Sequence, residues 1–132
     1  MIDIDDDLVA EQEKVYNIRH RCFYFSKSVI LFLKEQRIEK LYFSLFDQLL
    51  RSATSIGANV VEGGGGRTQK DFLNFQSIAL KSANETKYWL CLIRDTMEMN
   101  KESDIESLIQ EANELSKIIA SIILNSKGKT SK

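Results

Sequence analysis

The sequence has no proline, two cysteines and a single histidine in 132 residues. Without proline, long uninterrupted helices are favoured. Cys22 and Cys91 lie far apart, with no second cysteine nearby to complete a redox or zinc pair, so we interpret both as small buried hydrophobic residues. A Cys–His nucleophile would need His20 beside Cys22, but a two-residue spacing turns them apart on a helix. A di-iron bundle needs Glu-x-x-His, which does not occur. The sequence therefore predicts a non-enzyme with no metal, cofactor or catalytic residue.

Long apolar runs and a basic leader are also missing. The longest apolar runs, such as residues 29–33, are far shorter than a membrane span of ~20 residues. The acidic start MIDIDDD is unlike a signal peptide. We expect a cytoplasmic protein without a membrane partner. The hydrophobic content of 43% and charged content of 28% are ordinary for a globular chain. They favour one domain over residues 1–132, with an acidic leader at 1–10 and a disordered polar tail at 126–132.

Basic residues are not in excess overall, since the net charge is −1. The charge is nevertheless segregated along the chain. Residues 3–13 carry six acidic side chains and no basic one, whereas residues 14–37 carry six basic side chains against Glu35 alone. Residues 102–125 carry five acidic side chains against Lys117. The balanced total thus hides one basic helix and one acidic helix.

Apolar residues recur at spacings of three and four in four successive segments, which predicts helices over about 11–36, 41–62, 68–99 and 103–125. Thr68–Asp71 and Ser103–Glu106 resemble capping boxes that open the third and fourth helices. The expected core stripes are Val15, Ile18, Cys22, Phe25, Val29 and Phe32; Tyr42, Phe46, Leu49, Ala53, Ile56 and Val60; Phe72, Phe75, Ala79, Ser82, Thr86, Trp89, Ile93 and Met97; and Ile105, Leu108, Ala112, Leu115, Ile119 and Ile122. Short corners between such helices predict an all-α, antiparallel up-down four-helix bundle.

The first predicted helix has a second apolar set that points away from its core stripe: Phe23, Tyr24, Ile30 and Leu31. A helical wheel places four basic residues on the outward side as well: Arg19, Lys27, Lys34 and Arg37. An outward apolar face indicates a subunit interface, or aromatic residues set among basic ones for nucleic acid. A third reading, in which the basic residues only solvate the helix, also stays open.

The segment between the second and third helices, residues 51–75, has the most distinctive sequence of the chain. Small residues crowd the helix around Gly57, where close approach of a neighbouring backbone would offset the helix cost of glycine, roughly 1 kcal/mol. Four glycines follow at 63–66, and glycine can adopt positive φ and end a helix. A phosphate-binding loop is the alternative, but Arg67 and Thr68 after the glycines do not match the Walker pattern. The segment predicts a helix hairpin.

Residues 45–89, above all RSATSIGANVVEGGGGRTQKDFLNFQSIALKSANE, resemble the bacterial proteins encoded in intervening sequences of large-subunit (23S) ribosomal RNA genes, known as four-helix bundle proteins. The matching positions are Arg51, Ser55, Ile56, Ala58, Asn59, Glu62, Gly63, Arg67, Lys70, Phe72, Phe75, Ala79, Leu80, Ser82 and Glu85. Gly57 departs from the family, which commonly has proline there, and the extra glycines lengthen the turn.

The resemblance implies a bundle that assembles into a homo-oligomer, with a homopentamer as the expected form. It also points to the related accessory protein of diversity-generating retroelements, and so to RNA or DNA and a reverse transcriptase as partners. The candidate nucleic-acid-binding residues are Arg19, Lys27, Lys34, Arg37, Arg67, Lys70 and Lys81; the candidate oligomer interface is Phe23, Tyr24, Ile30 and Leu31. We therefore expect a non-enzymatic oligomeric adaptor that binds nucleic acid, or alternatively a structural module that binds protein only.

Overall fold

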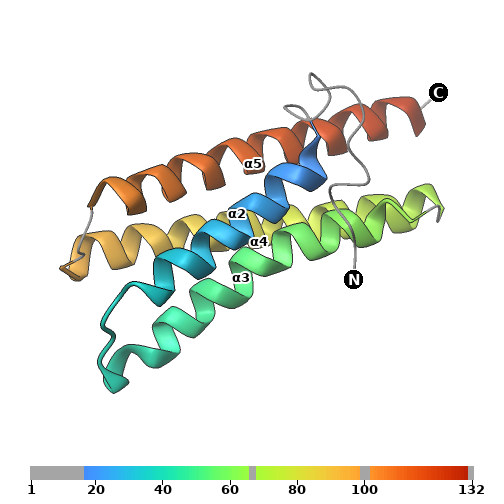
Figure 1. Ribbon diagram of the computed structural model, residues 1–132. Helices are drawn as coiled ribbons and strands as arrows, with labels where there is room; N and C mark the ends of the chain where they lie inside the picture. Colours follow the sequence, from blue (N-terminus) through green and yellow to red (C-terminus); the bar gives the residue numbers. More distant parts are fainter. Residues whose placement is uncertain (1–16, 66–67, 99–101, 131–132) are drawn as a thin grey trace.

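The computed structural model describes residues 17–65, 68–98 and 102–130, and these form a four-helix bundle. The long helices are α2 (Ile18–Lys34), α3 (Phe43–Gly63), α4 (Gln69–Thr96) and α5 (Glu102–Thr130). A short 3-10 helix, η2 (Lys40–Tyr42), leads into α3. Figure 1 shows successive helices running in opposite directions. The predicted fold class, an all-α antiparallel up-down bundle, is confirmed.

The helices occupy the corners of a square. Within the described part of the chain, each long helix packs on two neighbours, and no Cα atoms of the diagonal pairs α2–α4 and α3–α5 come within 8 Å of each other. The α3–α4 pair is the most closely associated and the α2–α5 pair the least. None of the described helices combines the length and apolar character needed to cross a bilayer.

The core follows the predicted stripes on α2 and α3, where Cys22, Phe25, Val29 and Phe32 and then Phe46, Leu49, Ala53, Ile56 and Val60 are buried. Val15 lies outside the described residues. Tyr42 was expected in the core but belongs to η2 and is 36% exposed. On α5 the stripe ends at Ile123 rather than Ile122, because the step from Ile119 is four residues.

The predicted stripe of α4 was partly wrong. Ala79, Thr86 and Ile93 are buried as expected, but the other buried positions are Gln76, Ala83 and Leu90. The larger residues expected there, Phe72, Phe75, Trp89 and Met97, are only half-buried, as is Ser82. Small side chains on the inward line of α4 allow α3 to approach closely, and the bulky ones lie along its margins.

Of the two predicted capping motifs one is confirmed and one is wrong, and α2 has a cap that was not predicted. The Asn17 side chain caps α2 by accepting hydrogen bonds from the backbone N–H groups of Arg19 (2.9 Å) and His20 (3.4 Å). Thr68 caps α4 as predicted, accepting from the Asp71 N–H at 3.2 Å. Ser103 lies inside α5, which begins at Glu102, so it is not an N-cap.

Two other predicted boundaries differ from the structure. The first helix ends at Lys34, two residues earlier than expected, because the N–H groups of Glu35 and Gln36 bond to carbonyls only three residues back. At the other end of the chain, α5 continues to Thr130, through most of the segment expected to be a polar tail. The predicted start of the first helix at residue 11 and the acidic leader lie outside the described residues.

Gly57 and Gly63 allow close packing of α3 against its neighbours, whereas Gly64 ends the helix. Gly64 caps α3 with φ −80°, so the helix ends in 3-10-type bonds rather than through a positive φ. A Cβ built on Gly63 would lie 2.9 Å from the Cβ of Phe75 in α4. One on Gly57 would lie 3.1 Å from the Cβ of Cys22 in α2. Gly57 and Gly63 thus let α3 approach α2 and α4 respectively.

Candidate nucleic-acid and self-association surfaces

The most distinctive sequence segment builds the interface between α3 and α4. Ser52 and Thr86 are both buried, and their hydroxyl groups are hydrogen bonded to each other at 3.0 Å. One helical turn away, the Ser82 hydroxyl donates to the Ser55 hydroxyl at 2.9 Å. Asn59 donates to the Ser55 carbonyl at 2.8 Å and to its hydroxyl at 3.0 Å. The two hydroxyl pairs join α3 to α4, and Asn59 bonds to Ser55 within α3, so these polar groups contribute to the packing of the helix pair.

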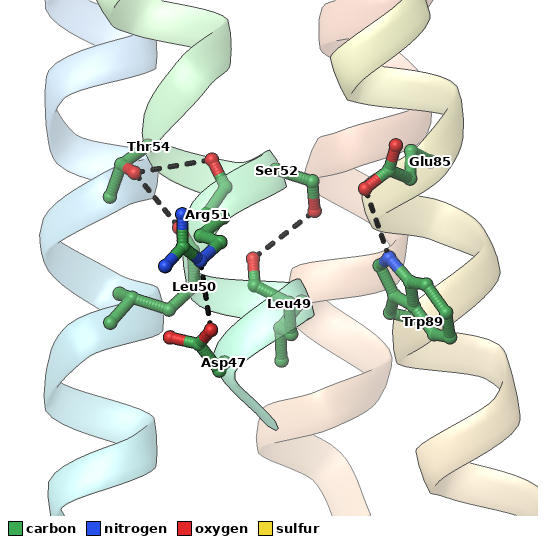
Figure 2. A network of polar contacts seen from close by, with 8 residues as sticks. All are labelled: Asp47, Leu49, Leu50, Arg51, Ser52, Thr54, Glu85 and Trp89. Atoms are coloured by element: carbon green, nitrogen blue, oxygen red, sulfur yellow. Dashed lines mark hydrogen bonds and ion pairs between the residues drawn. The ribbon is translucent and has the colours of Figure 1, made fainter. Parts of the chain in front are cut away.

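The outer side of the same helix pair carries local polar contacts (Figure 2). Arg51 donates from Nε to the Asp47 carboxylate one turn earlier at 2.8 Å, and Trp89 donates from its indole N–H to Glu85 at 3.1 Å. Both are contacts within one helix. The hydrogen bond from Arg51 to Asp47 raises the pKa of the arginine. The Arg51 cation is already paired with Asp47 and is highly exposed to solvent. The pair therefore orders these two side chains on the helix surface and contributes little to the free energy of unfolding.

The seven basic residues predicted to bind nucleic acid do not form one patch. Lys27 and Lys34 are exposed on α2, and Lys70 and Lys81 are exposed on α4. Because α2 and α4 are diagonal in the bundle, these two groups face opposite sides. Arg19 is half-buried on α2, and Arg37, expected on the helix, is exposed in the loop after it. Arg67 lies outside the described residues.

The four apolar residues predicted on the outward side of the first helix are half-exposed there: Phe23 (47%), Tyr24 (42%), Ile30 (42%) and Leu31 (48%). At 3.6 residues per turn, Lys27 and Lys34 fall on the line of Phe23 and Ile30. The basic and apolar sets of α2 therefore share one face. A subunit docked on this face would cover both lysines.

The outward line of α4 has a different composition. Lys70 and Lys81 are eleven residues apart, which is close to three turns, so they project from the same face. Tyr88 follows seven residues after Lys81, is 61% exposed, and packs edge-on against Trp89 with ring centroids 5.0 Å apart. Tyr88 was not among the residues predicted to bind nucleic acid. Its seven-residue spacing from Lys81 is the signal that could have identified it.

A groove runs between α2 and α5, the least closely packed neighbours, with a volume of about 510 Å³. Its apolar walls include Tyr24, Leu31 and Leu108, and its acidic groups are Glu35, Asp104 and Glu111. Arg21 donates to Glu111 from Nη2 at 2.6 Å and from Nε at 3.1 Å, which raises the pKa of the arginine. Sequence reasoning found the acidic helix but not this groove, because the groove exists only once α2 and α5 are placed side by side.

The residues with nucleophilic or metal-binding potential are dispersed. Burial raises the pKa of the Cys22 thiol to about 12, so at neutral pH it is protonated and behaves as the small hydrophobic residue predicted. Cys91 is half-buried on α4 rather than fully buried. In the described part of the chain, no three His, Cys, Asp or Glu side chains gather to hold a metal ion.

The motif residues 51–85 and the bundle around them agree with comparisons to known proteins. Residues 14–121 match the family model for the 23S rRNA-intervening sequence protein. The chain belongs to this family. It is also similar to the crystal structure of a protein of unknown function from the S23 ribosomal protein family of Bacteroides thetaiotaomicron VPI-5482. The two chains are 37% identical with a TM-score of 0.72, over 80% of this chain and 97% of that one. No curated protein matches.

Family membership confirms the resemblance and the four-helix bundle. The structure assigns roles to several residues of the family motif: Ser82 bonds to Ser55 across α3 and α4, Asn59 bonds to Ser55 within α3, and Gly63 makes room for Phe75. A binding function is therefore sought on the outward surfaces of α2, α4 and α5, which include the motif residue Lys70.

Proposed function

We propose that this protein is a non-enzymatic, self-associating cytoplasmic adaptor that binds RNA or DNA through the outward face of α4. The observation that carries the proposal is the division of the basic residues between opposite sides of the bundle. On α2 the lysines share their face with half-exposed apolar residues, which suits contact with protein. On α4, the exposed residues between Lys70 and Lys81 are Asn74, Ser77 and the half-exposed Ile78. This face carries fewer apolar side chains than that of α2 and suits contact with phosphate.

Self-association would make a modest patch effective. An overall charge of −1 gives no long-range attraction to nucleic acid, and two lysines neutralise few phosphates. Copies that assemble through α2 would leave α4 free on the opposite side and repeat its lysines along the assembly. Repetition on one scaffold raises avidity without any new contact. Tyr88 adds an exposed ring on which an unpaired base can stack.

The absence of an enzymatic role is supported by the chemistry of the candidate nucleophile. Cys22 lies against α3 at Gly57, and its raised thiol pKa leaves little thiolate at neutral pH. The family supplies no catalytic residue to carry over. A homopentamer and a reverse transcriptase partner remain proposals that follow from the resemblance.

The second candidate function is a module that binds only protein, favoured by the four half-exposed apolar residues of α2. The two candidates differ in the role of α4. If α4 is merely a solvated surface, replacing its lysines leaves the affinity for nucleic acid unchanged.

The test is fluorescence anisotropy with structured RNA and duplex DNA across a salt series. Lys70→Glu with Lys81→Glu should weaken binding at least tenfold at low salt and reduce the slope of log affinity against log salt by about 2. Lys40→Glu with Lys117→Glu makes the same charge change at two other exposed lysines and should have a much smaller effect. Wild-type protein that does not bind even at low salt would favour the protein-binding module, whereas equal losses in both variants would exclude α4 as the specific nucleic-acid surface.

A further inference from the structure

The α2–α5 groove has a chemical character that the nucleic-acid function does not use. Among the described residues, the groove is lined by the carboxylates of Glu35, Asp104 and Glu111, and Arg21 pairs with Glu111. The same groove has apolar walls, with Leu31 half-exposed at its edge. An apolar groove edged by carboxylates repels phosphate and favours a segment that is both apolar and basic.

The neighbouring line of α2 is such a segment. Phe23, Lys27, Ile30 and Lys34 are spaced by four, three and four residues, so they form a ridge along the helix in which apolar and basic side chains alternate. All four are exposed to solvent. Each ridge residue is followed in the sequence by a residue that lines the groove, about 100° further around the helix. Ridge and groove are therefore adjacent surfaces of one bundle that face different directions.

The two surfaces match in spacing as well as in charge. Lys27 and Lys34 are seven residues apart with Ile30 between them, and Asp104 and Glu111 are seven residues apart with Leu108 between them. Seven helical residues span about 10.5 Å in either helix. Two helices that lie side by side can thus bring both ammonium groups to both carboxylates while their apolar residues meet. Glu111 already accepts from Arg21, but its carboxylate is one-third exposed and has acceptor sites left for a lysine.

We infer that the α2–α5 groove receives the Phe23–Lys34 ridge of a second copy of this chain. The inference rests on the self-association in the proposed function and adds the surface that receives the α2 face. The contact is head-to-tail: each copy inserts its ridge into one neighbour and offers its groove to another. Such heterologous contacts build a closed ring when the rotation between copies closes and a filament when it does not.

Charge reversal with mixing tests the contact, with the mass in solution measured by light scattering after gel filtration. The ridge variant is Lys27→Glu with Lys34→Glu. The groove variant is Asp104→Lys, Arg21→Glu and Glu111→Lys, which reverses the charge at the two positions expected to meet the ridge lysines and retains an ion pair across α2 and α5. Wild-type protein should assemble, and each variant alone should have the mass of one chain. An equimolar mixture should regain assembly, because each contact between unlike variants joins a ridge to groove positions of opposite charge. In a ring with an odd number of copies one contact must join like variants, so the mixture is expected to form open chains or even-numbered rings.

The control and the outcomes separate this contact from the proposed function. Lys70→Glu with Lys81→Glu makes the same charge change as the ridge variant on the diagonal helix and should leave the mass unchanged; circular dichroism verifies the helicity of every variant. Assembly by both variants alone would overturn this contact while self-association stands. A mixture that stays monomeric, with both variants helical, would also overturn it. A monomeric wild type would overturn both self-association and the contact, whereas nucleic-acid binding by α4 is decided by anisotropy alone.

Discussion

The α3–α4 and α2–α5 interfaces differ in how closely the two helices pack and in which side chains join them. Between α3 and α4, small side chains and paired hydroxyls fill the interface, and Gly63 permits an approach that even a methyl group would obstruct. Between α2 and α5, a salt bridge joins Arg21 to Glu111 beside an open groove. The contrast shows that one side of the bundle is completed within the chain, whereas the other leaves apolar and charged groups available for contact.

The largest effect on stability should come from adding a side chain at Gly63, where α3 approaches α4 most closely. Gly63→Val places a Cβ where Phe75 lies at 2.9 Å, so α3 or α4 must shift, and overpacking of this kind lowers the free energy of unfolding by about 1–3 kcal/mol. Chemical denaturation measures it. Gly64→Ala, one residue later, is the control: Gly64 is exposed with φ −80°, and a Cβ added there would lie 3.5 Å from the nearest atom. Equal losses would show that the glycines serve the turn instead of the helix contact.

Breaking the hydroxyl pair should have an intermediate effect. Thr86→Val keeps the shape but removes the hydroxyl that bonds to Ser52 at 3.0 Å and to the Ser82 carbonyl at 2.7 Å, which should lower the free energy of unfolding by about 1 kcal/mol. A double-mutant cycle with Ser52→Ala isolates the coupling between the two side chains. Thr54→Val is the matched control, because the Thr54 hydroxyl bonds only to carbonyls of its own helix. Additive losses in the cycle would contradict a bond that joins the two helices.

Breaking the α2–α5 ion pair should matter least. Arg21 and Glu111 are each about one-third exposed (29% and 33%), so water screens their attraction. A cycle of Arg21→Gln and Glu111→Gln should give a coupling of less than about 1 kcal/mol that shrinks further in high salt. Arg51–Asp47, an exposed pair within α3, provides the comparison and should couple more weakly still. A coupling larger than that of Ser52–Thr86 would reverse the proposed difference between the two sides.

The sequence predicted most of the core stripes of α2 and α3 correctly because most of their buried residues are apolar, with His20 and Ser52 as the polar exceptions. It failed on α4, where Phe72 and Trp89 were expected inward but Gln76 and Ala83 are buried. Apolar periodicity locates a helix and its apolar side. A helix that packs on two neighbours, as α4 does on α3 and α5, also has a half-buried row of residues on each side of its buried centre. The choice between a large residue at the margin and a small one at the centre depends on how near α3 lies.

The sequence by itself determined that the chain forms four helices, where most of them turn, and to which family it belongs. These properties follow from local periodicity, from Thr68 as a cap and from a motif that is continuous along the chain. Only the tertiary structure decided that Lys27 and Lys81 face opposite sides, that Arg37 leaves the helix, and that Asp104 and Glu111 line a groove with α2. Side chains far apart in sequence acquire a common surface only when their helices pack, and charge on a single helix does not specify its neighbour.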